Sequence, residues 1–330
     1  MSSDRRLVAV AATVATCALV AACSDSSPSA LRPKGRGADR IAGLWWFLLW
    51  AAVAVTVAVV VLLAVAVLRR RREKAEGEDR SLALVIGGGV VLPVLVLPVV
   101  FVLTARTMAQ SSDRQRAARM QIEVVGHRWW WEVRYPDGAV TANEIHIPTG
   151  EPVRVALRSD DINHSLWVPE LQGKTDLVPG YTNVMWLEAR RPGVYRGQCA
   201  EFCGVQHAHM AFVVVADSPD RFAAWLDNER GPAAPPPDAH LLAGQQAFLR
   251  NPCVGCHTIR GTAATATIGP DLTHFASRSS IGALTIPNNA GNLAGWIENA
   301  QNAKPGSLMP PMSLDPGDLQ AILDYLETLR

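Results

Sequence analysis

Two long apolar runs, each free of charged side chains, dominate the first third of the sequence. They extend from Ile41 to Leu68 and from Ser81 to Ala105, and about 20 residues suffice for a helix to cross the hydrocarbon core of a bilayer. The short segment between them begins with four consecutive arginines, and such loops stay on the cytoplasmic side. The sequence therefore predicts transmembrane helices at 41–68 and 81–105, joined by a cytoplasmic basic loop at 69–80. Everything after Arg106 is expected on the extracytoplasmic side of a bacterial cytoplasmic membrane.

The N-terminus has the pattern of an export signal. Arg5 and Arg6 precede an apolar stretch from Leu7 to Ala22, and polar residues follow Cys23 at once. Small residues directly before a cysteine are typical of the bacterial lipoprotein cleavage site. We therefore predict a lipoprotein-type signal peptide at 1–22, lipidation of Cys23 and an extracytoplasmic segment at 23–40. A short uncleaved hydrophobic segment is the alternative, although the stretch is short for a span.

Residues 106–230 have the pattern of an all-β domain closed by one helix. Short runs of β-branched and aromatic residues alternate with turns such as Pro136-Asp137-Gly138, which is typical of a sandwich or barrel. The predicted elements are strands at Gln121–Val125, Trp129–Tyr135, Val153–Arg158, Thr182–Leu187, Gly193–Gln198 and Ala211–Val215, and a helix at Pro219–Glu229.

A proline-rich segment at 231–237 separates this domain from a second soluble one. Its composition predicts an extended, semi-rigid spacer. The following residues, 238–330, have apolar residues at helical spacing, above all in the last segment, where Leu319, Ile322, Leu323 and Leu326 share one face. The sequence therefore predicts a small all-α domain with helices at Asp238–Leu249, Asn292–Gln301 and Pro316–Leu329.

Soft metal ligands gather between Cys199 and Met210. Two cysteines, Cys199 and Cys203, are followed by His207 and Met210, and thiolate, imidazole and thioether together suit copper. Two thiolates can bridge a pair of copper ions, and His164, at the start of a predicted strand, supplies a second imidazole. A disulfide between the cysteines is one alternative, because the compartment is oxidising. A zinc site is another, although zinc does not call for methionine.

The segment Cys253-Val254-Gly255-Cys256-His257 has the spacing of c-type haem attachment. Two thioethers would fix the haem and His257 would be the proximal ligand, with half of a zinc site as the alternative. The segment from Lys304 to Pro310 resembles the distal loop of class I cytochromes c, so Met309 is the preferred sixth ligand, and Met312 is expected to pack. The segment from Gly269 to Leu272 resembles the part of these proteins whose proline carbonyl accepts a hydrogen bond from the proximal imidazole, which implies this role for Pro270.

These motifs resemble those of the cytochrome c oxidase subunit II family, over roughly Ala38 to Gly231, in the type that carries a fused cytochrome c domain. The resemblance implies a multidomain membrane protein with a two-helix transmembrane hairpin. It also implies an all-β cupredoxin domain with a dinuclear copper centre (CuA) at 106–230 and an all-α class I cytochrome c domain at 238–330.

The resemblance also assigns roles to individual residues. Cys199 and Cys203 would be the bridging thiolates, His164 and His207 the terminal imidazoles. Met210 would be the weak axial ligand. The Glu201 carbonyl would complete the second copper, and its carboxylate would reach a magnesium ion shared with subunit I; a solvated loop acid is the alternative. Trp129 would be the point at which electrons enter, whereas Trp130 and Trp131 are expected to pack.

The implied function is that of an electron-receiving subunit. Electrons from an external donor would pass through haem c and the copper pair to subunit I, which reduces oxygen while protons are translocated; subunit III would be a further partner. A copper-containing nitric oxide reductase is the main alternative, followed by a copper-delivery protein and a stand-alone electron carrier. The net charge of +1 gives no support for nucleic-acid binding. One departure is that Val85 to Pro93 lacks the family's acid and tryptophan, which puts a proton path through this subunit in doubt.

Overall fold

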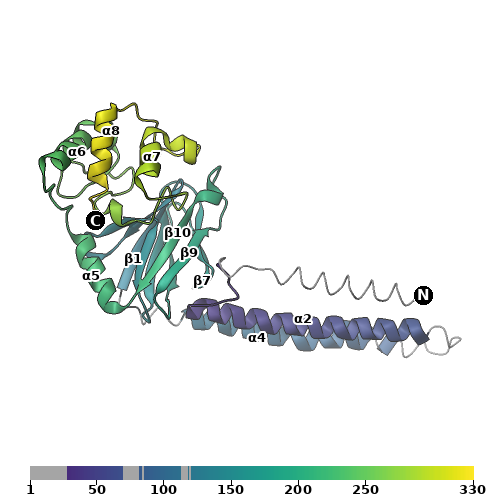
Figure 1. The fold of residues 1–330 in the computed structure, drawn as a ribbon. Helices are drawn as coiled ribbons and strands as arrows, with labels where there is room; N and C mark the ends of the chain where they lie inside the picture. The colour runs from purple at the N-terminus through teal and green to yellow at the C-terminus, as the bar shows by residue number, and fades with distance from the viewer. Residues whose placement is uncertain (1–27, 70–81, 84, 113–117, 119) are drawn as a thin grey trace, which may run out of the picture.

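The computed structural model describes residues 28–69, 82–83, 85–112, 118 and 120–330. The described chain forms a long helical hairpin, a β-sandwich and a small helical unit, in that order (Figure 1). The hairpin and the helical unit lie at opposite ends of the sandwich. The predicted signal peptide at 1–22, the lipidation site Cys23 and loop residues 70–80 lie outside the described residues.

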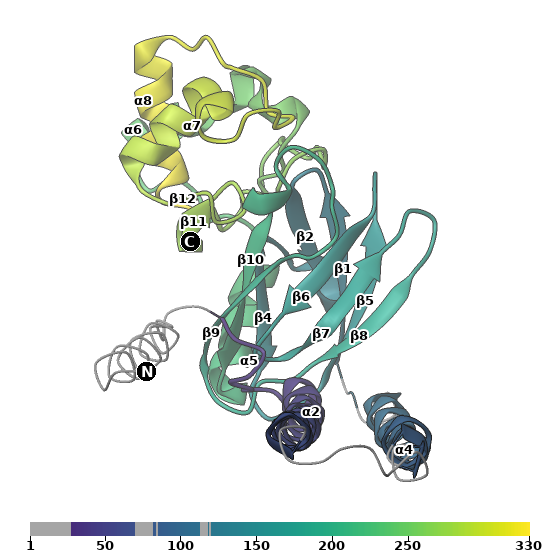
Figure 2. The same ribbon diagram turned by 90° about the vertical axis from the view of Figure 1, so that its right-hand side faces the viewer.

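The hairpin consists of α2 (Arg36–Arg69), a π-helical turn η1 (Gly87–Val91) and α4 (Leu92–Ser112). Apolar stretches of 32 residues in α2 and 24 residues in η1 and α4 are long enough to cross a bilayer. The helices lie side by side (Figures 1 and 2), and the Arg40 guanidinium donates to the Gln110 carbonyl over 2.6 Å. The two apolar helices suggest a membrane anchor. Both extend beyond the predicted spans, because a helix can continue past the hydrocarbon core.

The first turn of α2 is attached directly to the sandwich. The backbone N–H groups of Lys34 and Gly35 donate to the Glu170 carbonyl over 2.7 and 3.0 Å, and that of Ala38 donates to the Leu171 carbonyl over 3.0 Å. A Cβ added to Gly35 would lie 2.5 Å from the Leu171 carbonyl oxygen, so only glycine permits this approach. The membrane helix therefore begins against the soluble domain.

The sandwich packs two mixed sheets around one apolar core. One sheet has the strand order β3-β2-β1-β5-β8 and the other β4-β10-β9-β6-β7. Neighbouring strands are mostly antiparallel, but β1 pairs with β5 and β10 with β4 in parallel. The strands are β1 Met120–His127, β2 Trp130–Arg134, β3 Val140–Ala142, β4 Glu144–Pro148, β5 Val153–Ser159, β6 His164–Val168, β7 Gln172–Leu177, β8 Asn183–Leu187, β9 Gly193–Cys199 and β10 Ala211–Asp217.

The predicted strands and the closing helix, α5 (Pro219–Arg230), are confirmed. The sequence analysis missed β3, β4 and β7. β3 has three residues, and β7 is a mostly polar strand at the edge of its sheet. Such segments carry little of the apolar alternation by which a strand is recognised.

The helical unit packs α6 (Ala239–Arg250) and α7 (Ala290–Ala303) against α8 (Pro316–Leu326). The side chains of Asp238 and Asn289 cap the first two by accepting from backbone N–H groups of the first turn. The structure adds a short hairpin of β11 (Ser280–Ile281) and β12 (Ile286–Pro287), which lies at the sandwich end of the unit (Figure 2).

Hydrogen bonds hold the start of the proline-rich segment against the helical unit. The Ala233 N–H donates to the Arg260 carbonyl over 2.9 Å, and the Arg260 guanidinium donates to the carbonyls of Glu229 and Arg230 over 2.6 and 3.0 Å. The first residues of the predicted spacer are thus bound to the helical unit. The reason is that the Arg260 guanidinium has several N–H donors, and the carbonyl groups at the end of α5 lack partners within the helix.

Candidate copper and haem sites

The structure brings the predicted copper ligands together at one end of the sandwich. The Cys199 and Cys203 sulfurs lie 3.7 Å apart. The Nδ1 atom of His164 lies 4.0 Å from the Cys199 sulfur, and that of His207 lies 3.5 Å from the Cys203 sulfur. The Met210 sulfur is 3.8 Å from the Cys203 sulfur. Both cysteines are free, and 3.7 Å is far longer than a disulfide bond of about 2.0 Å.

Sheet register places these side chains. Cys199 ends β9, where it pairs with Leu166 of β6, the strand that begins with His164. The Cys199 N–H also donates to the Met210 carbonyl over 2.9 Å. A Cβ added to Gly126 would lie 2.9 Å from the His164 ring. Glycine at this position therefore makes room for the imidazole.

Asp161 fixes the orientation of the His164 ring. Its carboxylate lies 2.9 Å from His164 Nε2, so Nε2 carries the proton and Nδ1 faces the sulfurs. Burial opposes ionisation of Asp161, but the hydrogen bonds from His164 and from the Ile162 and Arg128 backbone together outweigh it and lower the pKa of Asp161 to about 2. The sequence analysis gave Asp161 no role. Its position three residues before a candidate ligand was the available signal.

The two sulfurs perturb each other strongly. The hydrogen bond between them lowers the pKa of Cys199, and the same bond together with burial raises the pKa of Cys203. The lowered pKa favours the thiolate form of Cys199, which is the form that binds a metal ion. His164 and Met210 are fully buried, and Cys199 and Cys203 are 4% and 1% exposed. This dry set of soft sulfur and imidazole donors fits copper.

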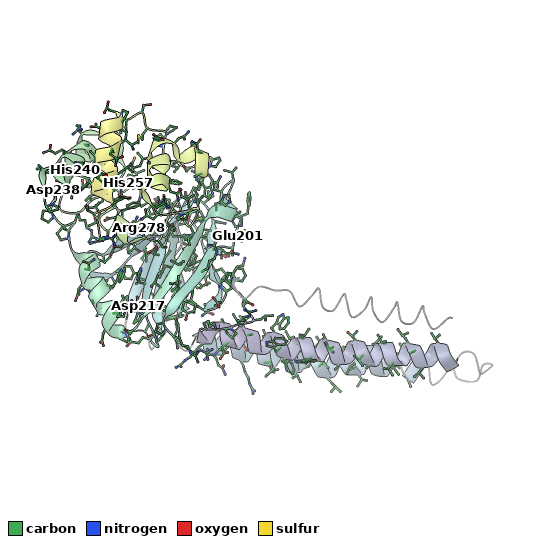
Figure 3. The ribbon with its side chains drawn as sticks, in the orientation of Figure 1. Glu201, Asp217, Asp238, His240, His257 and Arg278 are labelled. Carbon is green, nitrogen blue, oxygen red and sulfur yellow. The ribbon has the colours of Figure 1, made fainter. Side chains whose placement is uncertain are left out.

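Glu201 lies in the loop between the cysteines and is labelled at the edge of the sandwich in Figure 3. Its carbonyl oxygen is 3.2 Å from the Cys199 sulfur, close to the predicted copper position. Its carboxylate lies 3.7 Å from the Lys174 ammonium and is 44% exposed. Within the described residues, Glu201 belongs to no metal-sized group of His, Cys, Asp and Glu side chains.

The haem-attachment motif lies directly after α6. Cys253 and Cys256 belong to a short helical turn and are half-buried and free. His257 Nδ1 donates to the Pro270 carbonyl over 2.8 Å, so the predicted hydrogen bond is confirmed. A Cβ added to Gly269 would lie 2.7 Å from the His257 ring. Burial lowers the pKa of His257, which keeps Nε2 neutral and available for iron.

A largely apolar cavity is lined by Cys253, Cys256, His257, Met309 and Met312. Met309 also packs against the core of the helical unit, and its carbonyl accepts a hydrogen bond of 3.0 Å from the Gln301 side chain. The cavity thus offers two thiols, one imidazole and a thioether on its walls. That set fits a covalently attached haem.

The sandwich supplies part of the same cavity wall. Arg128, Trp129 and Asn143 line it together with residues of the helical unit. The Trp129 indole N–H donates to the Cys203 carbonyl over 2.6 Å, and the indole is covered by the helical unit at Gly306. The side chain to which the family resemblance assigns electron entry therefore contacts both candidate sites.

The neighbouring aromatic and histidine residues have structural partners. Trp131 is fully buried against Phe212, with ring centres 5.4 Å apart, and packs as predicted. Trp130 stacks on His127 at 4.4 Å. Three further histidines bind nearby polar groups: His127 to Glu132, His209 to Gln206 and His240 to Asp324.

Comparison with known proteins gives one consistent result. The family described as cytochrome c oxidase subunit II, periplasmic domain, matches residues 138–217, and the cytochrome c family matches residues 241–330. The chain is 37% identical to cytochrome c oxidase subunit 2 of Alkalihalophilus pseudofirmus, over 73% of this chain and 71% of the relative. It is 31% identical to cytochrome c oxidase subunit 2 of Bacillus sp. strain PS3, over 94% of each chain.

Among solved structures, the periplasmic domain of subunit II of a cytochrome oxidase from Bradyrhizobium japonicum is 28% identical. The match covers 34% of this chain and 94% of that chain, with a TM-score of 0.33.

Proposed function

The chain belongs to the cytochrome c oxidase subunit II family, and we propose that it takes electrons from an external donor at a covalent haem c and delivers them through a dinuclear copper centre to subunit I. It is a subunit of an oxidoreductase complex with a cupredoxin-like domain and a cytochrome c domain, and subunit I is its partner. The named relatives are oxidase subunits, so nitric oxide reductase is not favoured.

The observation that carries the proposed electron path is the position of Trp129. Its ring lines the haem cavity, and its N–H is bonded to the backbone of the candidate copper ligand Cys203. An external protein has no open access to an indole that is 8% exposed. The protein's own cytochrome domain therefore takes the place of a diffusing donor at Trp129.

The copper pair would be held by the thiolates of Cys199 and Cys203, the imidazoles of His164 and His207, the Met210 thioether and the Glu201 carbonyl. Such a pair supplies one-electron transfer with little change of geometry. The chain's own part is to exclude water, through the burial described above, and to hold His164 in one orientation through Asp161. The Glu201 carboxylate is exposed enough to share a magnesium ion with subunit I.

The haem would be attached through Cys253 and Cys256, with His257 and Met309 as axial ligands. Haem supplies reversible one-electron chemistry, and a methionine ligand raises its potential. The Pro270 carbonyl fixes the tautomer of His257, and Gln301 holds the main chain at Met309. Met312 also lines the cavity, but its position is tied to α7 through a 3.0 Å bond from its N–H to the Glu298 carbonyl.

Both soluble domains are placed outside the cytoplasm of a bacterial cell, with Cys23 lipidated after removal of residues 1–22. The basic loop supports this topology, and c-type haem attachment suits an exported chain. Subunit III is a further expected partner. Proton translocation is assigned to the partner subunits, because the second apolar helix carries no carboxylate between residues 85 and 105.

Metal analysis and spectroscopy of the purified complex test this function. We expect two coppers in this subunit for each covalent haem, a near-infrared copper band and an electron paramagnetic signal split by two copper nuclei. Oxygen consumption should exceed nitric oxide consumption. A signal from a single copper nucleus would contradict the dinuclear assignment, and preferential nitric oxide turnover would contradict the oxidase.

A further inference from the structure

A buried lysine lies between the sandwich and the helical unit. Lys304 follows α7 and is 2% exposed. Its ammonium donates to the carbonyl oxygens of Trp129, His209 and Gly282 over 2.8, 2.7 and 2.6 Å. Trp129 and His209 belong to the sandwich, whereas Gly282 belongs to the β11–β12 hairpin. One side chain therefore bonds the main chains of both domains.

The contacts match the donor capacity of an ammonium group. A lysine side chain carries three N–H donors, and here three carbonyl oxygens receive them. Burial lowers the pKa of Lys304 to about 7 despite the opposing attraction of Cys203, and hydrogen bonds from the charged form favour that form. All three of these hydrogen-bond partners of Lys304 are main-chain carbonyl groups.

The acceptors on the sandwich side belong to the copper site. Trp129 bonds the Cys203 carbonyl through its indole N–H, and His209 directly precedes the candidate ligand Met210. The copper loop is defined here as residues 199–210. The Lys304 ammonium holds the main chain of His209 within this loop and that of Trp129, whose indole bonds the loop.

In the helical unit, Lys304 is the first residue of the loop that leads from α7 to Met309. The next residue, Pro305, accepts a hydrogen bond of 2.7 Å from the Gln206 side chain of the copper loop. A Cβ added to Gly306 would lie 3.2 Å from Val205 and 3.6 Å from the Trp129 ring. The loop that carries the candidate haem ligand thus lies directly against the copper loop.

Three further hydrogen bonds join the domains nearby. The backbone N–H and the hydroxyl of Ser279 donate to the Glu144 carboxylate over 2.9 and 2.8 Å. The Ala211 N–H donates to the Ala283 carbonyl over 3.3 Å. Both of these backbone amides report whether the domains are docked, because they are protected only while the interface is closed.

From this geometry we propose that Lys304 is the positioning residue for electron transfer within the subunit: it locks the haem cavity against Trp129 and the copper loop. Transfer then takes place inside one fixed assembly and does not wait for a tethered domain to find its site. The proposal rests on the proposed function, in which one electron from the external donor leaves the haem iron, oxidising it by one unit, and reduces the copper pair by one unit.

The test compares Lys304→Met with Lys34→Met in the full-length, metal-loaded complex. Lys34 is exposed and lies at the start of α2, so it provides the same substitution away from the interface. The first measurement is hydrogen exchange of peptides covering residues 209–212 and 278–284. We expect exchange to rise about tenfold or more in Lys304→Met, because the loss of charge-assisted hydrogen bonds opens the interface, and to stay unchanged in Lys34→Met.

The second measurement follows haem reoxidation and copper reduction after photoreduction of the haem, with and without added viscogen. In the wild type the rate should not depend on viscosity. In Lys304→Met it should fall about tenfold or more and decrease further with viscosity, because each transfer must wait for docking. The haem potential and the copper spectrum should be unchanged, which separates positioning from damage to either centre.

The outcomes separate the two proposals. If wild-type protein transfers no electron from haem to copper, the proposed function fails. If it does, and Lys304→Met matches the wild type in exchange and rate, the role of Lys304 alone is refuted. If Lys304→Met does not assemble, the wild-type protein still tests the proposal. A wild-type haem-to-copper transfer rate that falls in proportion to viscosity would show that the domains are not locked together.

Discussion

The copper and haem sites of this chain are built in different ways. The copper donors come from β6, β9 and the loop that β9 leads into, and adjacent donors already lie within 4.0 Å of one another. The haem donors line a broad cavity whose wall is completed by another domain. A sheet can fix a metal site through its register alone, whereas a helical unit of this size depends on its neighbour and on the group it encloses. The copper site should therefore be sensitive to single atoms, and the haem site to docking.

Loss of one bridging sulfur gives the largest expected effect. Cys199→Ser should lower copper affinity and oxygen uptake by more than about 100-fold, because even a residue outside the ligand set can cost 10- to 100-fold. Haem should remain attached, since Cys253 packs against the separate core of the helical unit. Copper content, oxygen uptake and a covalent haem stain check this. Retained oxygen uptake would show that Cys199 is not a ligand.

Trp129→Phe tests whether the two sites are connected through the indole. The substitution keeps an aromatic ring but removes the N–H that bonds the Cys203 carbonyl. We expect haem-to-copper transfer to slow about tenfold, with unchanged potentials, as followed after photoreduction. Trp225→Phe is the control, because Trp225 stacks on His146 and is not among the residues that line the haem cavity. Equal rates in the two variants would remove Trp129 from the path.

Gly126→Ala probes the sensitivity of the copper site to volume. The added methyl group would lie 2.9 Å from the His164 ring, and overpacking of this kind costs about 1–3 kcal/mol. We expect lower thermal stability and weaker copper binding, measured by calorimetry and metal titration. Gly295→Ala is the matched control, since no atom lies within 4 Å of its added Cβ. If both variants behave alike, the copper site tolerates more movement than the structure indicates.

The smallest expected effect is at the domain interface. Glu144→Gln keeps a side-chain oxygen that can accept from Ser279 and removes only the charge, so it loses a fraction of the about 1.5–3 kcal/mol that a hydrogen bond to a charged group contributes. Although burial raises the pKa of Glu144, hydrogen bonds from His146 and Ser279 outweigh it and lower that pKa below 4.5. A carboxylate with a lowered pKa stabilises the folded form above its ordinary pKa and loses that effect as pH falls through the lowered value.

Docking in the wild type should therefore persist above pH 4.5 and weaken below it. Exchange of the 278–284 peptide as a function of pH measures this, and Glu144→Gln should lose the pH dependence. An unchanged pH profile in the variant would assign the effect to another group.

The sequence predicted what local spacing encodes. The cysteine, histidine and methionine pattern identified donors that the structure brings together, and long apolar runs identified the hairpin. It could not predict contacts that arise only when domains dock. Lys304 is a lone lysine after a helix, and Asp161 is one acid in a polar loop. The proline-rich segment was predicted to be a spacer from its composition. Composition gives no information about its contact with Arg260, which lies elsewhere in the chain.

The attachment of α2 to the sandwich has a mechanical consequence. Main-chain bonds to residues 170 and 171 hold the start of α2 against the copper domain. The distance of the copper site from the bilayer then depends on the tilt of α2. A helix longer than the local hydrocarbon thickness tilts to fit it. A thinner bilayer should therefore tilt α2 further and change the position of the copper site relative to subunit I.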